Sequence, residues 1–239
     1  MRRGFLFLLT VLSVVMFAAV SCDKAHSTSD GRIQGVYTVY GNTLLPERTD
    51  TFYTVGNMRE FDLKHGDRAI ITLAYEIDNL VGAQFAKWSI QSVDEKLVTH
   101  SLTPKGDVDA TEYSSVIDGP ADWSFFMYGK YWLWNKYQNF YIQYYSDGTK
   151  GDFKLSPVAM SGDTLCFELN SKFVAGDKAN VELLTFDVSD AYSMLSTEEA
   201  AKLLAADSIY TKITTKVNLV EQDTVVMYTY GGGKYKKTF

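Results

Sequence analysis

Side chains that could carry out chemistry are few and widely spaced in this 239-residue chain. Cys166 lies in an alternating run, 163–169, that predicts a strand, and no histidine or basic residue stands beside it to favour a reactive thiolate. The three histidines, His26, His65 and His100, are too far apart in sequence to form a cluster with metal-ligand spacing. We therefore expect a packed or half-covered thiol at Cys166, no metal site and no cofactor.

The sequence also lacks the usual motifs of hydrolases and of phosphate-binding enzymes. No Gly-x-Ser-x-Gly elbow occurs, and the glycine run 231–233 with Lys234 follows an expected terminal strand and opens no helix, so it is not a phosphate loop. Asp94 and Glu95 form the most visible carboxylate pair, and such pairs can hydrolyse glycosides. Neighbours on a strand point to opposite faces, however, and in a turn they are commonly solvated. We expect no catalytic residues and no enzyme activity.

The most unusual segment is aromatic. Of the 23 residues from Trp123 to Tyr145, 12 are Trp, Phe or Tyr, too many for one core-facing side of a hairpin. If 128–135 and 140–145 are paired strands, rings project from both faces, and a sandwich buries only one of them. The other face carries either cross-strand aromatic pairs or an exposed platform for a glycan or a partner protein. The candidate binding surface consists of Trp132, Trp134, Tyr141 and Tyr145.

The N-terminus has the layout of a secretory signal. Two arginines precede the apolar stretch 4–20, which is at the short limit of a membrane-spanning helix. Residues 19–22, Ala-Val-Ser-Cys, resemble the lipobox of bacterial lipoproteins. The resemblance implies that residues 1–21 are a signal peptide and that Cys22 is lipidated, with fatty acids such as palmitate holding the chain to a membrane. Without lipidation, the segment would be a plain signal peptide or an uncleaved anchor.

The lipobox resemblance also bears on charge, disulfides and location. Removal of residues 1–21 takes away two arginines and no acids, so the formal charge changes from −6 to −8. An acidic chain lacks the electrostatic footprint of a nucleic-acid-binding protein. A lipidated Cys22 leaves Cys166 without a disulfide partner. We expect a cell-envelope protein at the outer membrane, on its periplasmic or its surface face, with the polar residues 22–32 as a tether.

The remaining chain predicts β structure throughout. Strands are expected at 33–40, 51–55, 68–78 and 88–101, and their close spacing without a helix indicates a small barrel or sandwich. Residues 104–107 break the pattern. Further strands then follow at 128–135, 139–145, 154–157, 164–169, 180–188, 212–220 and 224–230. A capping box at Ser196–Glu199 predicts one short helix over 200–206. The expected fold class is all-β, with domains over 33–103 and 111–234.

Four stretches carry a further resemblance: Gly35–Tyr37, Lys64–Ile70, Asp163–Leu169 and Leu184–Val188. With the lipobox and the tether, they look like the NigD-like lipoproteins of gut and oral Bacteroidota. That resemblance implies an OB-like barrel over 33–103 followed by a β-sandwich over 111–234, and it brings no catalytic residue. We expect a membrane-anchored, non-catalytic module that binds a protein partner or serves as an accessory. The alternative is a surface lipoprotein that binds a glycan on its aromatic platform.

Overall fold

The computed structural model describes residues 29–47, 51–78, 85–120, 131–206, 209–216 and 225–229. Cys22, the signal segment, most of the tether and the aromatic residues 123–128 lie outside these ranges. Among the described residues, no helix has the length and apolar character that a membrane crossing requires. The all-β class is confirmed: strands make up most of the described structure, with a single α-helix among its described elements.

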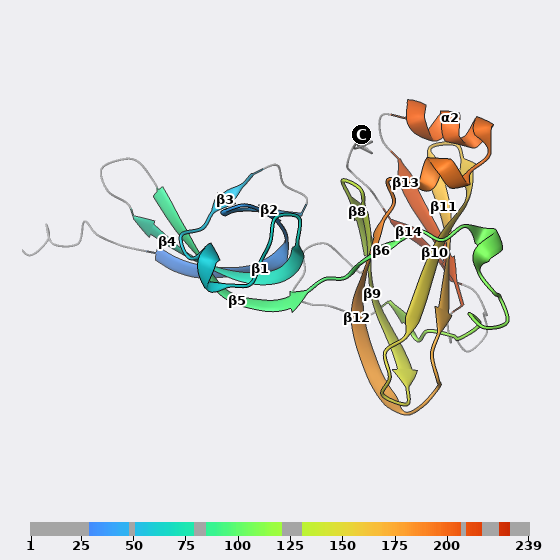
Figure 1. The fold of residues 1–239 in the computed structure, drawn as a ribbon, viewed down its shortest axis with the longest axis horizontal. Helices are drawn as coiled ribbons and strands as arrows, with labels where there is room; N and C mark the ends of the chain where they lie inside the picture. The colour runs from blue at the N-terminus through green and yellow to red at the C-terminus, as the bar shows by residue number, and fades with distance from the viewer. Residues whose placement is uncertain are drawn as a thin grey trace, which may run out of the picture.

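The first sheet curls into a half-barrel (Figure 1). Its strand order is β3-β2-β1-β4-β5, with these bounds: β1 Ser29–Tyr40, β2 Thr43–Pro46, β3 Tyr53–Thr54, β4 Arg68–Asp78 and β5 Phe85–Lys96. A bridge between Val55 and Trp88 joins the two outer strands, where the Gly56 N–H donates to the Trp88 carbonyl at 3.3 Å. The arrangement is that of a five-stranded, partly open barrel, as expected for an OB-like domain.

Alternation along β1 and β4 gives the barrel two apolar faces. Tyr37, Ile71 and Leu73 point inward to the barrel core. Val36 and Ile70, which are paired across β1 and β4 and almost fully buried, belong to a different cluster outside the barrel. Successive residues of a strand face opposite sides of the sheet. Buried apolar residues at both odd and even positions therefore mean that the barrel's outer surface is also covered here.

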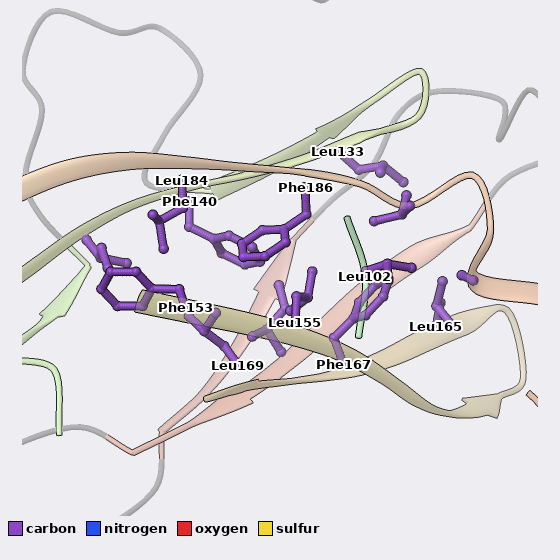
Figure 2. Close-up of a cluster of buried hydrophobic side chains, with 14 of the residues drawn as sticks. Leu102, Leu133, Phe140, Phe153, Leu155, Leu165, Phe167, Leu169, Leu184 and Phe186 are labelled. Atoms are coloured by element: carbon purple, nitrogen blue, oxygen red, sulfur yellow. The ribbon is translucent and has the colours of Figure 1, made fainter. Parts of the chain in front are cut away.

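The second half forms a two-sheet sandwich. One sheet contains β10 Asp152–Ser161, β11 Thr164–Lys172, β13 Tyr210–Thr215 and β14 Val225–Thr229 in that order. The other has the order β6-β12-β9-β7, with β8 also paired to β9, and its bounds are β6 Thr99–Ser101, β7 Gly119–Pro120, β8 Tyr131–Trp134, β9 Tyr137–Ser146 and β12 Lys178–Asp187. Figure 2 shows Phe140, Phe153, Phe167 and Phe186 meeting in the core between the sheets.

Local sequence signals explain several elements of the sandwich. In β11, Leu165, Phe167 and Leu169 are buried, whereas Cys166 on the opposite face is half-buried, as the alternation predicts. The helix α2, Thr197–Ala205, begins with the predicted capping box. Glu199 closes that box and also accepts the Met160 N–H of β10 at 3.1 Å, so the helix is fastened to the sandwich. Short 3-10 turns lie at Met58–Glu60, Lys105–Asp107 and Ala191–Met194.

Three of the differences from the sequence expectation concern which strands form and where they pair. Residues 29–32, predicted as tether, belong to β1, because their backbone continues the ladder with β4. The strand β2 was not expected; a turn with Gly41 at φ +64° folds it back on β1. The predicted strand 88–101 is two strands: the Leu97 N–H makes the last bond to the barrel, to the Arg68 carbonyl, and β6 then pairs with β12 of the sandwich.

The barrel covers one end of the outer face of the β9–β12 sheet. Figure 1 shows β9 and β12 on the side of the sandwich nearer the barrel. A cluster that we call the seam joins the two halves; it contains Val36, Ile70, Leu97, Trp132, Trp134, Tyr141 and Leu183. The expectation that a sandwich leaves one ring-bearing face of the hairpin unburied therefore fails at this end, because the barrel packs on that face.

Candidate functional site

The four predicted platform residues do not form one surface. Trp132 is 0% exposed, so the prediction of a surface ring is wrong for it. Trp134 and Tyr141 are half-buried in the seam, and burial raises the pKa of the Tyr141 phenol. Tyr145 is 42% exposed. The sheet's outer face thus changes along β9, from a covered end at the seam to an open end at Tyr145.

A buried polar network holds the covered end. Glu47, at the end of β2, and Arg68, at the start of β4, form an ion pair with both side chains 1% exposed. The same carboxylate accepts the indole N–H of Trp132 and, at 3.3 Å, the amide of Asn139. The side-chain oxygen Oδ1 of Asn139 in turn accepts hydrogen bonds from Arg68 Nη2 at 3.1 Å and from the Thr185 hydroxyl at 2.9 Å. Barrel and sandwich therefore share one set of hydrogen bonds, which we call the seam network.

The guanidinium of Arg68 remains charged at neutral pH despite its burial. Burial lowers the pKa of Arg68 to about 10, against the opposing effects of Tyr137 and Asp187. The Tyr137 ring lies under the guanidinium, 4.0 Å from its carbon, a cation–π contact. Each side chain of the seam network is closed to solvent, so the network presents no surface to a ligand, and its hydrogen bonds join the two halves.

Local sequence gives little sign of this network. Glu47 and Arg68 are 21 residues apart, and Glu47 is 92 residues from Asn139. Each looks like an ordinary surface residue beside a turn. The sequence offers one indirect sign of the seam. Val36 and Ile70 are apolar although their side chains point out of the barrel, which indicates that another part of the protein covers them.

The open end of β9 borders a concave site that we call the distal hollow. It has a volume of about 380 Å³ and is lined by Ser114, Ser115, Val116, Asp118, Tyr145, Phe173, Ala175 and Gly176. Ligand pockets typically have about 300–1,000 Å³, mostly apolar walls and a few placed polar groups. Of the sequence-predicted surface residues, only Tyr145 belongs to it. The other lining residues come from segments for which no site was predicted.

Hydrogen bonds on both sides hold the hollow open. Ser115 is fixed to the end of β11 through its backbone N–H to the Ser171 carbonyl and through its hydroxyl, which accepts the Phe173 N–H at 3.0 Å. The Asp147 N–H donates to the Val174 carbonyl at 3.0 Å, which ties the opposite wall to β9. At Gly176 a Cβ atom would lie 2.4 Å from the Ser146 carbonyl oxygen, so only glycine allows this close approach. The hollow is a preformed feature of the fold.

Polar groups at the hollow are placed by β9. The Asp118 N–H donates to the Gln143 carbonyl. The amide of Gln143 donates to Asp118 Oδ2 at 3.5 Å and to the Tyr145 hydroxyl at 3.3 Å. One amide therefore orients both a carboxylate and a phenol toward the same site.

The other candidate groups stay separate. Among the described residues, no three His, Cys, Asp or Glu side chains come together as a metal site would require. His100 packs on Phe186 at 5.3 Å, and burial lowers its pKa; His65 is exposed beside Tyr40. Partial burial raises the pKa of Asp94, but hydrogen bonds from Ser92, Gln34 and Thr72 outweigh it, and the net shift is downward. A carboxylate held ionised in this way is unsuited to act as a general acid.

Solved structures with a similar fold include proteins from Bacteroides and Parabacteroides. No protein-family model matches the sequence, and no curated protein matches it significantly. A structure titled "Putative lipoprotein" from Bacteroides fragilis has 14% identity and a TM-score of 0.57 over 86% of this chain and 98% of its own. A "Putative TOXIN related protein" from Parabacteroides distasonis has 12% identity and a TM-score of 0.56 over 85% and 94%. A NigD-like immunity protein from Bacteroides caccae has 17% identity and a TM-score of 0.45 over 85% and 92%. A NigD-like protein is thus among the similar structures, and at identities of 12–17% the likeness is one of fold.

Proposed function

We propose that this chain is a lipid-anchored, non-catalytic binding module of the NigD-like kind in the bacterial cell envelope, and that it holds a partner protein at the distal hollow. The observation that carries the proposal is the hollow itself, a preformed concavity beside the one predicted ring that stays exposed. Val116, Val174 and Val181, at 44%, 62% and 49% exposure, add apolar surface around this end of the sandwich. Exposed apolar patches of this kind commonly mark interaction sites.

The position of the hollow suits an anchored protein. Ser29 begins β1 only seven residues after the proposed anchor at Cys22, and it pairs with Ile77 at the far end of β4 from Arg68. At about 3.3 Å per residue, roughly 30 Å of strand separates that end from the seam. Tyr145 lies six residues along β9 beyond Asn139 of the seam network, roughly 20 Å of strand away from it. Acyl chains on Cys22 would therefore hold the barrel end at the membrane and leave the hollow free.

Site-specific photocrosslinking in cells that express the full chain tests the proposal. A photoreactive residue at Val116, in the hollow, should give one discrete protein adduct. The matched control is Val98, which is 70% exposed and lies outside the hollow, and it should give none. The adduct at position 116 should disappear with Tyr145→Ala. Equal labelling at both positions, or labelling that ignores Tyr145, would overturn the proposal.

A glycan is the competing ligand, and one observation favours it: the exposed Tyr145 ring beside a carboxylate could stack on a sugar and accept its hydroxyls. In that case the adduct at position 116 would contain carbohydrate and no protein.

A further inference from the structure

Among its described lining residues, the distal hollow has one charged group and no cation. Of the eight lining residues only Asp118 is charged, and it is half-buried. Within the described part of the chain, the carboxylate of Asp118 receives one long hydrogen bond, 3.5 Å from the neutral amide of Gln143. Asp187, by contrast, is paired with Lys136 at 2.6 Å. The Asp118 carboxylate is therefore partly shielded within the hollow. No cationic side chain among the described residues is paired with it.

The second placed group is the Tyr145 ring. It is 42% exposed at the rim, and the Gln143 amide fixes its hydroxyl on the same side as the Asp118 carboxylate. A carboxylate beside an aromatic face accepts a cation with an apolar stem: the charge pairs with the carboxylate and the stem or the guanidinium plane lies on the ring. An anionic ligand would be repelled by Asp118, the one charged group among the described lining residues.

The size of the hollow and the overall charge of the chain also favour a cationic side chain as the ligand. A hollow of about 380 Å³ holds a single long side chain of a partner and not a whole domain. The chain is acidic, with a formal charge of −6 that becomes −8 after the proposed signal cleavage, so it attracts basic surfaces before contact. Arginine is also among the residues that most often anchor an interface by filling a pocket.

We infer that the distal hollow receives an arginine or lysine side chain of the partner protein, with its charge on Asp118 and its stem against Tyr145. This inference rests on the proposed function and gives the partner a chemistry: a basic residue in an exposed segment, flanked by apolar residues that meet Val116 and Val174. It makes Asp118 the residue that sets specificity for charge and Tyr145 the residue that sets it for shape.

Binding of defined peptides to the purified full chain in non-ionic detergent tests the inference. The probe is a fluorescent, otherwise glycine- and serine-only peptide with one central arginine, compared with the same peptide carrying glutamine. We expect the arginine peptide to bind at least ten-fold more tightly, a preference that weakens as salt rises. Asp118→Asn should remove that preference. Asp163→Asn, the same charge change at an exposed turn outside the hollow, should preserve it.

Variants at Tyr145 distinguish loss of the aromatic ring from loss of the folded structure. Tyr145→Phe keeps the ring and should retain the preference for arginine, whereas Tyr145→Leu should lose most of it, with melting temperatures recorded for each variant. Equal binding of both peptides, or a preference that survives Asp118→Asn in a folded protein, would overturn the inference. So would retention of maltohexaose with neither peptide bound. In all these cases a Tyr145-dependent protein adduct at position 116 would still support the proposed function, so the two failures are distinguishable.

Discussion

Loss of the Glu47 carboxylate tests the seam network quantitatively. Glu47→Gln keeps the size of the side chain and an oxygen for the Trp132 indole, but it leaves the Arg68 charge buried without its counter-ion. Arg68 already has Nε and Nη1 without a partner among the described residues, so no spare acceptor can compensate there. Removing one partner of a buried ion pair typically costs about 3–5 kcal/mol. That is a large share of the roughly 5–15 kcal/mol by which proteins are usually stable.

The double replacement Glu47→Leu with Arg68→Met removes the whole ion pair, whereas each single replacement leaves one charge buried without its partner. A buried ion pair that is replaced as a whole by apolar residues is often neutral or stabilising, so we expect the double variant to be more stable than either single one. The matched control is Lys105→Met, which breaks the exposed pair with Glu168 at 3.1 Å. An exposed pair contributes about 0–1 kcal/mol.

Urea unfolding monitored by tryptophan fluorescence and by circular dichroism is the assay. The midpoints give the differences in free energy, and coincidence of the two signals shows whether barrel and sandwich unfold together. The reasoning is refuted if Glu47→Gln lowers the unfolding free energy by no more than Lys105→Met does. It is also refuted if the double variant is as unstable as the sum of the single ones, because a direct pair must show coupling.

Three further predictions concern rings, backbone and pH. Trp132→Ala should lower the unfolding free energy by about 3–5 kcal/mol as a core truncation, whereas Tyr145→Ala should leave it nearly unchanged; equal losses in calorimetry would contradict the exposure difference. Gly176→Ala should lower the melting temperature, because its Cβ would meet the Ser146 backbone, while Gly56→Ala, with nothing within 4 Å, should not; the reverse order would show that the hollow's wall is loose. Burial raises the pKa of Asp187, but hydrogen bonds from Lys136 and Ser189 outweigh it and hold the pKa below its usual 3.8. A depressed carboxyl pKa stabilises the fold above the unfolded value and ceases to do so as pH falls through the folded one. The stability difference between wild type and Asp187→Asn should thus be constant from about pH 7 to 5 and shrink below about pH 4; a difference that persists there would refute the assignment.

The sequence predicts those parts of the fold that depend on neighbours along the chain. Alternation in 163–169 places Cys166 on the correct face of β11, and the Ser196–Glu199 capping box locates the helix. Both signals are local, since a strand has a period of two and a helix cap spans four residues.

The seam and the hollow depend on contacts between distant segments. Glu47 meets Asn139 across 92 residues, and the walls of the hollow come from segments around positions 115, 145 and 175. No periodicity in one segment records which other segment will cover it. The sequence shows that the segment 123–145 is unusually aromatic, but it does not separate the part of β9 that the barrel covers from the part left open.

Hydroxyl-radical footprinting of Tyr145 most directly tests whether a partner occupies the hollow. Oxidation is measured by mass spectrometry in the purified chain and in intact envelopes, with Tyr40, 40% exposed on the barrel, as the internal reference and buried Trp132 as the protected one. We expect Tyr145 and Tyr40 to be oxidised in the purified chain, and Tyr145 alone to become protected in the envelope. Equal oxidation of Tyr145 in the two samples, with Tyr40 also unchanged, would contradict the account.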